Sequence, residues 1–375
     1  MPAPPIRVLL IAPSLDILGG QAVQATRLMD GMRQVDSVRM KFLPINPRLP
    51  GLLRGLQQIR YVRTFSTWLL YLFKLLAAAA RCDLLHIFSA GCSSYLLWSV
   101  PAIYVGRLYG KKIILNYRDG QCEDHLRNWK TAKPPLRLVH EIIAPTDFIV
   151  DVMAKFGFNA RCIPNILDLN RFHYRRREKL RPIFMTNRIL EPLYNVGCIL
   201  RGFAVIQRRY PNATLAVAHD GVCRPGLERL ARDLELRNVT FLGRVPHDRM
   251  PALYDQADIY LTTPNTDCMP GSLLECYASG LPIVATKAGG IPYILADGQT
   301  GLLIPIDDHE ALAEAAFRLL KDPELVARLT ANARRECEQY RWVHIRDRWT
   351  GTYHRLLGRP WLPSAEPEGA SGAAC

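Results

Sequence analysis

The chain has 375 residues, of which 49% are hydrophobic and 22% charged, and its formal net charge is +14 at pH 7. This length is enough for two domains with full cores, and the ordinary globular composition excludes a low-complexity or fibrous class. The ten cysteines form no CxxC pair, so we expect reduced thiols, with neither a disulfide framework nor a metal site. The first five residues lack the basic start and apolar centre of a signal peptide, and we therefore predict a cytoplasmic protein.

The positive charge lies in the first half of the chain. Residues 1–177 contain 25 Lys and Arg against 11 Asp and Glu, whereas residues 178–375 contain 23 of each kind. A basic surface attracts an anionic partner such as a phospholipid head group, a lipid diphosphate or nucleic acid. A solvated surface kept soluble by its charge is the alternative. Nucleic acid is not expected, because the basic residues are spread out and no DNA- or RNA-binding signature is present.

Residues 68–80, WLLYLFKLLAAAA, form the longest apolar feature of this basic half. The run is too short to span a bilayer and contains Lys74. It is compatible with a helix at a membrane interface, which would attach the protein peripherally to the inner membrane face. A buried core helix is the alternative, since the leucines would also pack well inside a domain.

The first half reads as alternating strands and helices. Residues 7–13 are a continuous apolar run, typical of a strand buried on both faces. Gly19-Gly20 and an amphipathic helix over residues 21–33 follow in the order of a nucleotide-binding unit, although GxGxxG is absent. Further strands are predicted at residues 39–44, 83–88, 112–117, 141–145 and 161–164. This alternation indicates a mostly parallel sheet covered by helices on both faces.

A second alternating series follows residues 165–180, whose polar, basic composition predicts a linker. Its strands are predicted at residues 182–186, 214–218, 239–242, 259–262, 283–286 and 301–304. The predicted fold class is therefore α/β, with two Rossmann-like doubly wound domains facing an interdomain cleft and ligands at the carboxyl ends of the strands. We place the domains at residues 1–170 and 178–340, a helix that packs back on the first domain at 341–358, and a disordered tail at 359–375.

Residues 264–290, PNTDCMPGSLLECYASGLPIVATKAGG, carry the strongest functional signal. Asp267 and Glu275 are eight positions apart, and a Pro270-Gly271 turn between them starts a helix. The free N–H groups of the first helical turn, at Gly271, Ser272 and Leu273, suit a phosphate. The two acids suit the hydroxyls of a sugar or ribose. The segment therefore predicts a binding site for a nucleotide sugar.

At this point the chain resembles the retaining GT-B glycosyltransferases of the group 1 type, in family 4, over most of residues 6–350. The first marks are Gly19-Gly20, which resembles the glycine loop beside the diphosphate, and Asn187-Arg188, which resembles the arginine after the first strand of the nucleotide domain. Asp267 and Glu275 resemble the paired acids. The remaining marks are Pro164-Asn165 with Asp168 and Arg171-Phe172, then Phe241-Leu242-Gly243, then Gly289-Gly290-Ile291-Pro292.

The resemblance implies a retaining, metal-independent enzyme that moves a sugar from a nucleotide-diphosphate sugar to a hydroxyl of a glycan or lipid-linked acceptor. The first domain would be the acceptor side, the second would bind the nucleotide sugar, and no cofactor beyond this co-substrate is expected. The negative charge that grows on the leaving diphosphate must be stabilised by cations and helix N-termini. Arg188 is the leading candidate for that role, with Asp267 at the donor sugar and Glu275 on the ribose.

Several positions depart from the family pattern. Leu193, Tyr194 and Asn195 stand where a lysine usually follows the arginine, and Pro270 has no N–H to offer a phosphate. Arg118 replaces the usual histidine after the fourth strand, and we predict that it supplies the missing cation across the cleft. These departures leave a second interpretation open, a degenerate GT-B domain that binds a nucleotide or glycan without transfer.

His86 lies toward the end of the strand predicted at residues 83–88 and is a further candidate for a substrate-binding residue facing the cleft. A buried core histidine is the alternative for this position.

Overall fold

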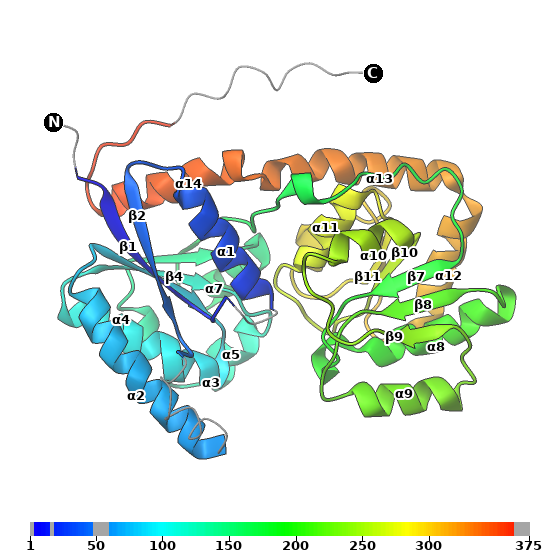
Figure 1. Cartoon of the computed structure of the whole chain (residues 1–375), viewed down its shortest axis with the longest axis horizontal. Helices are drawn as coiled ribbons and strands as arrows, with labels where there is room; N and C mark the ends of the chain where they lie inside the picture. Colours follow the sequence, from blue (N-terminus) through cyan, green and yellow to red (C-terminus); the bar gives the residue numbers. More distant parts are fainter. Residues whose placement is uncertain (1–3, 16–18, 48–59, 364–375) are drawn as a thin grey trace.

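The structure is a computed structural model that describes residues 4–15, 19–47 and 60–363. Two six-stranded sheets lie side by side, each flanked by helices (Figure 1). Residues 364–375, the larger part of the predicted disordered tail, lie outside the described ranges.

The first sheet has the strand order β2-β1-β3-β4-β5-β6. Its pairings are all parallel, with Leu10 of β1 beside His86 of β3 in the register. The strands are β1 (Ile6–Ala12), β2 (Val38–Pro44), β3 (Leu84–Ser89), β4 (Lys112–Tyr117), β5 (Glu141–Ala144) and β6 (Ala160–Cys162). Helices cover both faces of the sheet, so its central strands are buried on both sides. They are α1 (Gly20–Met32), α2 (Arg60–Ala79), α3 (Cys92–Ser94), the π-helical turn η2 (Tyr95–Ser99), α4 (Val100–Leu108), α5 (Cys122–Asn128), α6 (Lys133–Leu136) and α7 (Asp147–Lys155).

The second sheet has the order β12-β11-β10-β7-β8-β9 and is also parallel throughout. Its strands are β7 (Ile183–Thr186), β8 (Thr214–Val217), β9 (Val239–Phe241), β10 (Ile259–Thr262), β11 (Ile283–Thr286) and β12 (Leu302–Ile304). Its helices are α8 (Val196–Arg209), α9 (Arg224–Asp233), α10 (Met250–Gln256), α11 (Gly271–Ser279), α12 (His309–Lys321) and α13 (Pro323–Cys337). Short 3-10 turns lie at η3 (Leu169–Arg171), η4 (Pro192–Tyr194), η5 (Ile291–Tyr293) and η6 (Glu338–Tyr340).

The last helix, α14 (Trp342–Leu356), returns to the first sheet. Figure 1 shows α13 and α14 running one after the other along one side of the molecule. Ile345, Trp349 and Tyr353 of α14 belong to the same core cluster as Ile6 and Leu10 of β1. The C-terminal helix therefore completes the core of the first domain.

Residues 165–180, the predicted linker, are held against the second domain by one of their arginines. Arg177 is buried and donates to the carbonyl oxygens of Ser279 and Gly280, both at 2.7 Å, and of Tyr254 at 2.8 Å. A guanidinium has five N–H donors, so it can satisfy several carbonyls at once. The basic run thus anchors the chain to the second domain.

The apolar run at residues 68–80 lies almost wholly in α2. Tyr71, Leu75 and Ala79 are buried against the first sheet, while Phe73 is exposed. Within the described ranges, no helix is both long and apolar enough to cross a bilayer.

Candidate nucleotide-sugar site

A cleft of about 340 Å³ lies between the two domains and takes its lining from both. The lining residues follow the carboxyl ends of the strands: Gly19 and Gly20 after β1, Arg118 after β4, Asn187 and Arg188 after β7, and Asp267 after β10. This is where open parallel sheets bind ligands, because the loops there converge on the crevice.

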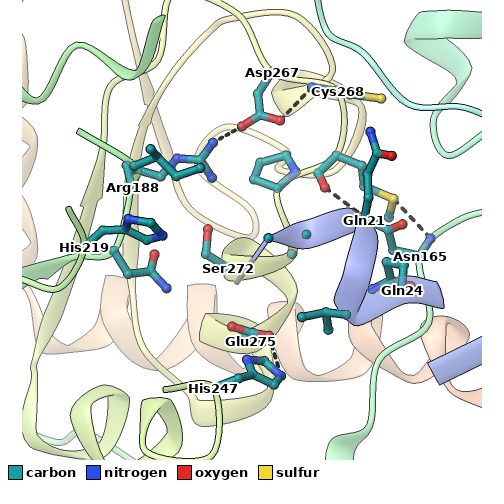
Figure 2. A pocket seen from close by; sticks show the side chains of 18 of the residues that line it. Gln21, Gln24, Asn165, Arg188, His219, His247, Asp267, Cys268, Ser272 and Glu275 are labelled. Atoms are coloured by element: carbon teal, nitrogen blue, oxygen red, sulfur yellow. Dashed lines mark hydrogen bonds and ion pairs between the residues drawn. The ribbon is translucent and has the colours of Figure 1, made fainter. Parts of the chain in front are cut away.

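Arg188 and Asp267 face each other across the second-domain side of the cleft (Figure 2). Arg188 Nη2 donates to Asp267 Oδ2, and the other oxygen, Oδ1, accepts the Cys268 N–H at 2.7 Å. The guanidinium also lies over the ring of Tyr194, 4.3 Å from its centroid. Burial by itself would lower the pKa of Arg188, but the attraction of Asp267 outweighs it and the net pKa is raised. Arg188 is therefore a permanent cation whose charge is shared with Asp267.

The start of α11 opens into the cleft. The helix begins at Gly271 after Pro270, and no side chain caps its first N–H groups. A Cβ added at Gly271 would meet no atom within 4 Å, so the space in front of this helix end is free. The Ser272 hydroxyl lines the same space and is buried without a hydrogen-bond partner of good geometry among the described residues. An anion placed here would meet unsatisfied donors and the positive end of the helix dipole.

Leu273 does not share this role, and the expectation that its N–H is free for a phosphate is wrong. Its N–H donates to the Pro270 carbonyl at 3.2 Å, and its side chain is fully buried in the core. The first turn of α11 is thus closed by an i to i+3 bond, as helix starts often are.

Glu275 is buried at the floor of the cleft, pointing inward (Figure 2). Its Oε2 accepts the Tyr254 hydroxyl at 2.8 Å, and its Oε1 lies 3.4 Å from Arg27 Nη2. Asn187 Nδ2 donates to the same Tyr254 hydroxyl at 2.7 Å. His247 Nε2 is 3.9 Å from Oε1. Burial lowers the pKa of this imidazole and so favours its neutral form. The carboxylate is thus held in one orientation, with lone pairs left for a ligand.

The first domain contributes the opposite wall. Gly19 and Gly20 line the cleft, and a Cβ added at either would meet open space, so a ligand can approach the backbone closely there. Arg118 also lines the cleft, and burial lowers its pKa to about 10, which keeps it charged at neutral pH. It donates to Asn165 Oδ1 and lies over the Phe88 ring, 4.8 Å from the centroid. Arg118 and Arg188 therefore reach the same cleft from different domains.

His86 does not reach the cleft, which corrects the expectation that it faces this space. The residue is fully buried, with Nδ1 2.8 Å from the Tyr353 hydroxyl and Nε2 3.3 Å from Asn116 Nδ2. Its ring packs against Trp349, with centroids 4.5 Å apart. The face of β3 that carries His86 is covered by α14, an element more than 250 positions away in the sequence.

Two further lining residues have no sequence signal. Arg27 of α1 donates to the Ile166 carbonyl at 2.7 Å as well as reaching Glu275 in the other domain. Gln24 binds the same backbone unit twice, through the Ile166 N–H at 2.7 Å and its carbonyl at 3.0 Å. Both tie α1 to the segment that crosses between the domains. Neither could be found from the sequence, because a polar residue on an amphipathic helix is ordinarily solvated.

Among the described residues, no group of three or more His, Cys, Asp or Glu side chains is placed to hold a metal ion.

Sequence comparisons converge on one family. Residues 168–336 match the model of the glycosyl transferases group 1. The chain is 29% identical over 192 residues to D-inositol 3-phosphate glycosyltransferase of Corynebacterium urealyticum, covering 49% of this chain and 45% of the relative. It is 30% identical over 155 residues to a GDP-mannose-dependent alpha-(1-6)-phosphatidylinositol monomannoside mannosyltransferase of Mycolicibacterium smegmatis, covering 39% and 41%. The matches thus span less than half the length of these curated relatives.

Solved structures share the fold over nearly the whole chain. Anabaena Alr3699/HepE, solved with UDP and glucose, superposes with a TM-score of 0.73 at 17% identity, over 93% of this chain and 100% of that one. Sucrose-phosphate synthase from Thermosynechococcus elongatus gives 0.73 at 18% identity, over 94% and 99%. The predicted fold of two Rossmann-like domains is confirmed. The second domain, over residues 168–336, thus matches the group 1 glycosyltransferases, and the chain as a whole shares the GT-B fold of its structural neighbours.

Proposed function

We propose that this protein transfers a sugar, with retention and without a bound metal, from a nucleotide-diphosphate sugar to a hydroxyl of a glycan or lipid-linked acceptor. One observation carries the proposal: Arg188, the uncapped start of α11 and Glu275 converge on one cleft, with Arg118 and the Gly19-Gly20 turn opposite. Each of these groups suits a different part of a nucleotide sugar, and together they could bind its diphosphate, its ribose and its sugar.

The diphosphate would lie at the start of α11, where no side chain of the described residues caps the first N–H groups and where the Ser272 hydroxyl lines the same space. Glu275 would accept the ribose diol. Arg188 would turn from Asp267 to the diphosphate, which would free Asp267 to accept hydroxyls of the donor sugar. As the bond to the sugar breaks, charge grows on the leaving phosphate, and each well-placed donor there contributes on the order of 10²–10³ in rate. Arg118 would provide a second cation from the acceptor side.

Retention is supported by the carboxylates of the cleft. Asp267 and Glu275 are the acids among the lining residues, and each is already held, by Arg188 and by Tyr254 with Arg27 respectively. In the proposed complex Glu275 stays with Tyr254 and the ribose, and Asp267 accepts hydroxyls of the donor sugar, so we assign neither as a general base on the far side of the sugar. The leaving phosphate is then the base that accepts the acceptor proton, which requires attack on the face from which it departs.

The donor can be sought among uridine and guanosine diphosphate sugars, since a fold neighbour was solved with UDP-glucose and a relative is named for GDP-mannose. The test is to incubate the full chain with such a panel in the presence of EDTA and to measure nucleoside diphosphate release and the anomeric configuration of the product. We expect turnover with a donor of one base, an unchanged anomeric configuration, and insensitivity to EDTA. An inverted product would refute retention, and rescue by a divalent cation would refute metal independence.

Matched variants connect turnover to the site. Arg188→Gln should reduce kcat by on the order of 10²–10³, whereas Arg328→Gln, at an exposed position of α13, should leave it unchanged. Glu275→Gln should weaken nucleotide binding, seen as loss of the thermal shift that a bound ligand causes. Equal activity of Arg188→Gln and the control would contradict the proposed role of this cation.

A degenerate GT-B domain that binds a nucleotide without transfer is the second candidate. It is favoured by the Arg188–Asp267 ion pair, which engages the arginine that the second domain contributes to the cleft lining, and by Tyr194 in the region where a lysine is usual. A nucleotide-dependent thermal shift, with neither transfer nor hydrolysis of any donor sugar, would establish it.

A further inference from the structure

One stretch of the first domain is almost free of acidic residues. Residues 37–118 contain twelve Lys or Arg and a single acid, Asp83. That carboxylate is already paired with Arg7, at 2.6 Å from Nη2. The segment includes α2, η2 and α4, so the outer surface of these helices carries no carboxylate of its own.

The same surface exposes large apolar side chains. Phe65 and Phe73 of α2 are 63% and 69% exposed, and Leu108 of α4 is 77% exposed. On α2 the exposed positions are opposite the buried Tyr71 and Leu75, so this helix is apolar on two sides. The further exposed members are Val62 of α2, Leu97 of η2 and Tyr104 of α4. Several large exposed apolar side chains on neighbouring helices are typical of an interaction site.

The helices lie beside each other, which makes their exposed residues one face. Trp68 of α2 donates its indole N–H to the Leu97 carbonyl at 3.1 Å, and the Tyr71 hydroxyl donates to the Trp98 carbonyl at 2.8 Å. The Tyr71 and Trp98 rings pack edge to face, 5.4 Å between centroids. In Figure 1, α2 and α4 form the outer edge of the first domain, away from the second. We call this surface the α2–α4 face.

Cations border the apolar residues. Arg63 and Lys74 are exposed on α2, and Arg81 follows its end. None of the three has an ion pair among the described residues. Arg107 is exposed next to Leu108 on α4 and lies 3.4 Å from a His140 ring nitrogen rather than from a carboxylate. The face therefore combines exposed apolar side chains with exposed cations that have no carboxylate partner among the described residues.

We propose that the α2–α4 face docks on the surface of a bilayer that contains anionic lipids. Charge complementarity identifies this occupant: the apolar side chains enter the interfacial region while the cations meet lipid phosphates, and no carboxylate opposes the contact. A purely apolar partner would leave the cations unmatched. The docking follows from this surface alone and does not depend on the transfer activity.

The face also adjoins a hollow of about 200 Å³ that is lined by Phe88, Trp98 and Ser99. Gly19, Gly20 and Gln21 line both this hollow and the main cleft. In η2, Leu97 lies on the outer face and Trp98 lines the hollow, so one π-helical turn separates the two. If the proposed transfer is correct, the head group of an amphiphilic acceptor would reach the cleft past η2 while its tail stays in the bilayer.

The test is co-sedimentation of the full chain with phosphatidylcholine vesicles, with and without about 30% phosphatidylglycerol, at low and moderate salt. We expect binding to the anionic vesicles only, weakened by salt. Phe65→Ser with Phe73→Ser, and separately Arg63→Glu with Lys74→Glu, should each weaken binding about tenfold or more. The controls Val222→Ser and Arg328→Glu, at exposed positions of the second domain, should bind as the wild type does.

Nucleotide binding provides the control for folding, since neither pair of substitutions touches the cleft. Variants that bind vesicles as well as the wild type, or equal binding to neutral and anionic vesicles, would overturn the proposal. So would a concentration-dependent dimer that the Phe65→Ser, Phe73→Ser variant abolishes, because a second copy would then be the occupant. Vesicle binding without any transfer activity would leave the docking intact and refute only the proposed function.

Discussion

At the scale of single residues, the site depends on how its charged groups are held. Glu275 owes its orientation to the Tyr254 hydroxyl, which in turn accepts from Asn187, while the Tyr260 hydroxyl donates to Asn187 Oδ1 at 2.6 Å. Each side chain in this hydrogen-bonded network has a partner, and satisfied polar networks of this kind fix side-chain positions in a buried site. Arg188 and Asp267 are held in the same way, by each other.

Removing the phenolic oxygen in the middle of this network should therefore weaken nucleotide binding. In Tyr254→Phe, one oxygen of Glu275 and the Asn187 amide lose their buried partners, which costs about 1–3 kcal/mol of stability. We expect roughly a tenfold loss of nucleotide affinity by calorimetry, since a misoriented carboxylate binds a diol poorly. Tyr210→Phe, whose hydroxyl takes no part in the network, is the matched control. Unchanged affinity in Tyr254→Phe would show that Glu275 is oriented by other contacts.

Arg118 permits a second prediction at this scale. If it stabilises the leaving diphosphate, Arg118→Gln should lower kcat by on the order of 10²–10³ and change the apparent affinity for the nucleotide less. A glutamine retains a donor for Asn165, which keeps the crossing segment in place. The measurement is steady-state turnover at saturating donor. Full turnover of this variant would assign Arg118 a structural role only.

At the scale of elements, the two ends of α11 differ in whether their backbone groups are capped. Its start is left without caps and faces the cleft, whereas its end is closed by Gly280, with φ of +62°, and by the guanidinium of Arg177. The left-handed conformation at Gly280 favours glycine and ends the helix. The open end can then bind a ligand while the closed end holds the helix in the core.

Arg177→Met should show how much the closed end contributes. The substitution leaves carbonyl groups of Ser279, Gly280 and Tyr254 buried without their donor, and we expect the free energy of unfolding to fall by about 3 kcal/mol or more. Arg176→Met, at the exposed neighbouring position, should change it by less than about 0.5 kcal/mol. Denaturant unfolding of both variants makes the comparison. Equal stability would mean that water replaces the guanidinium at these carbonyls.

At the scale of the whole molecule, the C-terminal helix belongs to the core of the N-terminal domain. His86 on β3 and Tyr353 on α14 share a hydrogen bond inside the cluster that α14 completes. Burial there lowers the pKa of His86 from 6.5 to about 3. The domains are also joined across the cleft by Arg27 with Glu275 and by Tyr293 with Asp151. The two lobes are thus coupled through both the cleft and the C-terminus.

This burial predicts a dependence of stability on pH. Between about pH 3 and 6.5 the unfolded chain protonates His86 and the folded chain does not, so stability falls as the pH decreases, by up to about 1.4 kcal/mol per unit. His86→Gln keeps hydrogen-bonding groups but cannot titrate, and its stability should depend less steeply on pH in this window. Parallel wild-type and His86→Gln curves would show that the buried imidazole is protonated without cost.

The sequence alone was sufficient for the features that depend on local pattern. Continuous apolar runs such as that in β1 predicted strands buried on both faces, and their alternation with helices predicted two parallel sheets. The spacing of Asp267 and Glu275 around Pro270-Gly271 predicted a loop, a helix start and an acid within the helix, and both acids line the cleft. These features are local because turn residues and hydrophobic periodicity act within a few positions of the chain.

Only the tertiary structure decided which distant groups meet. The sequence places His86 in an apolar strand, but only the structure shows that α14 covers it. The sequence shows a basic run at residues 165–180, but only the structure shows that carbonyls at the end of α11 and in α10 hold Arg177. The pairing of Arg188 with Asp267, 79 positions away, likewise depends on how β7 and the loop after β10 are placed. The sequence pattern indicates whether a side chain is buried, and the residue type gives its charge. What covers or neutralises it is set by packing between elements that the local sequence does not encode.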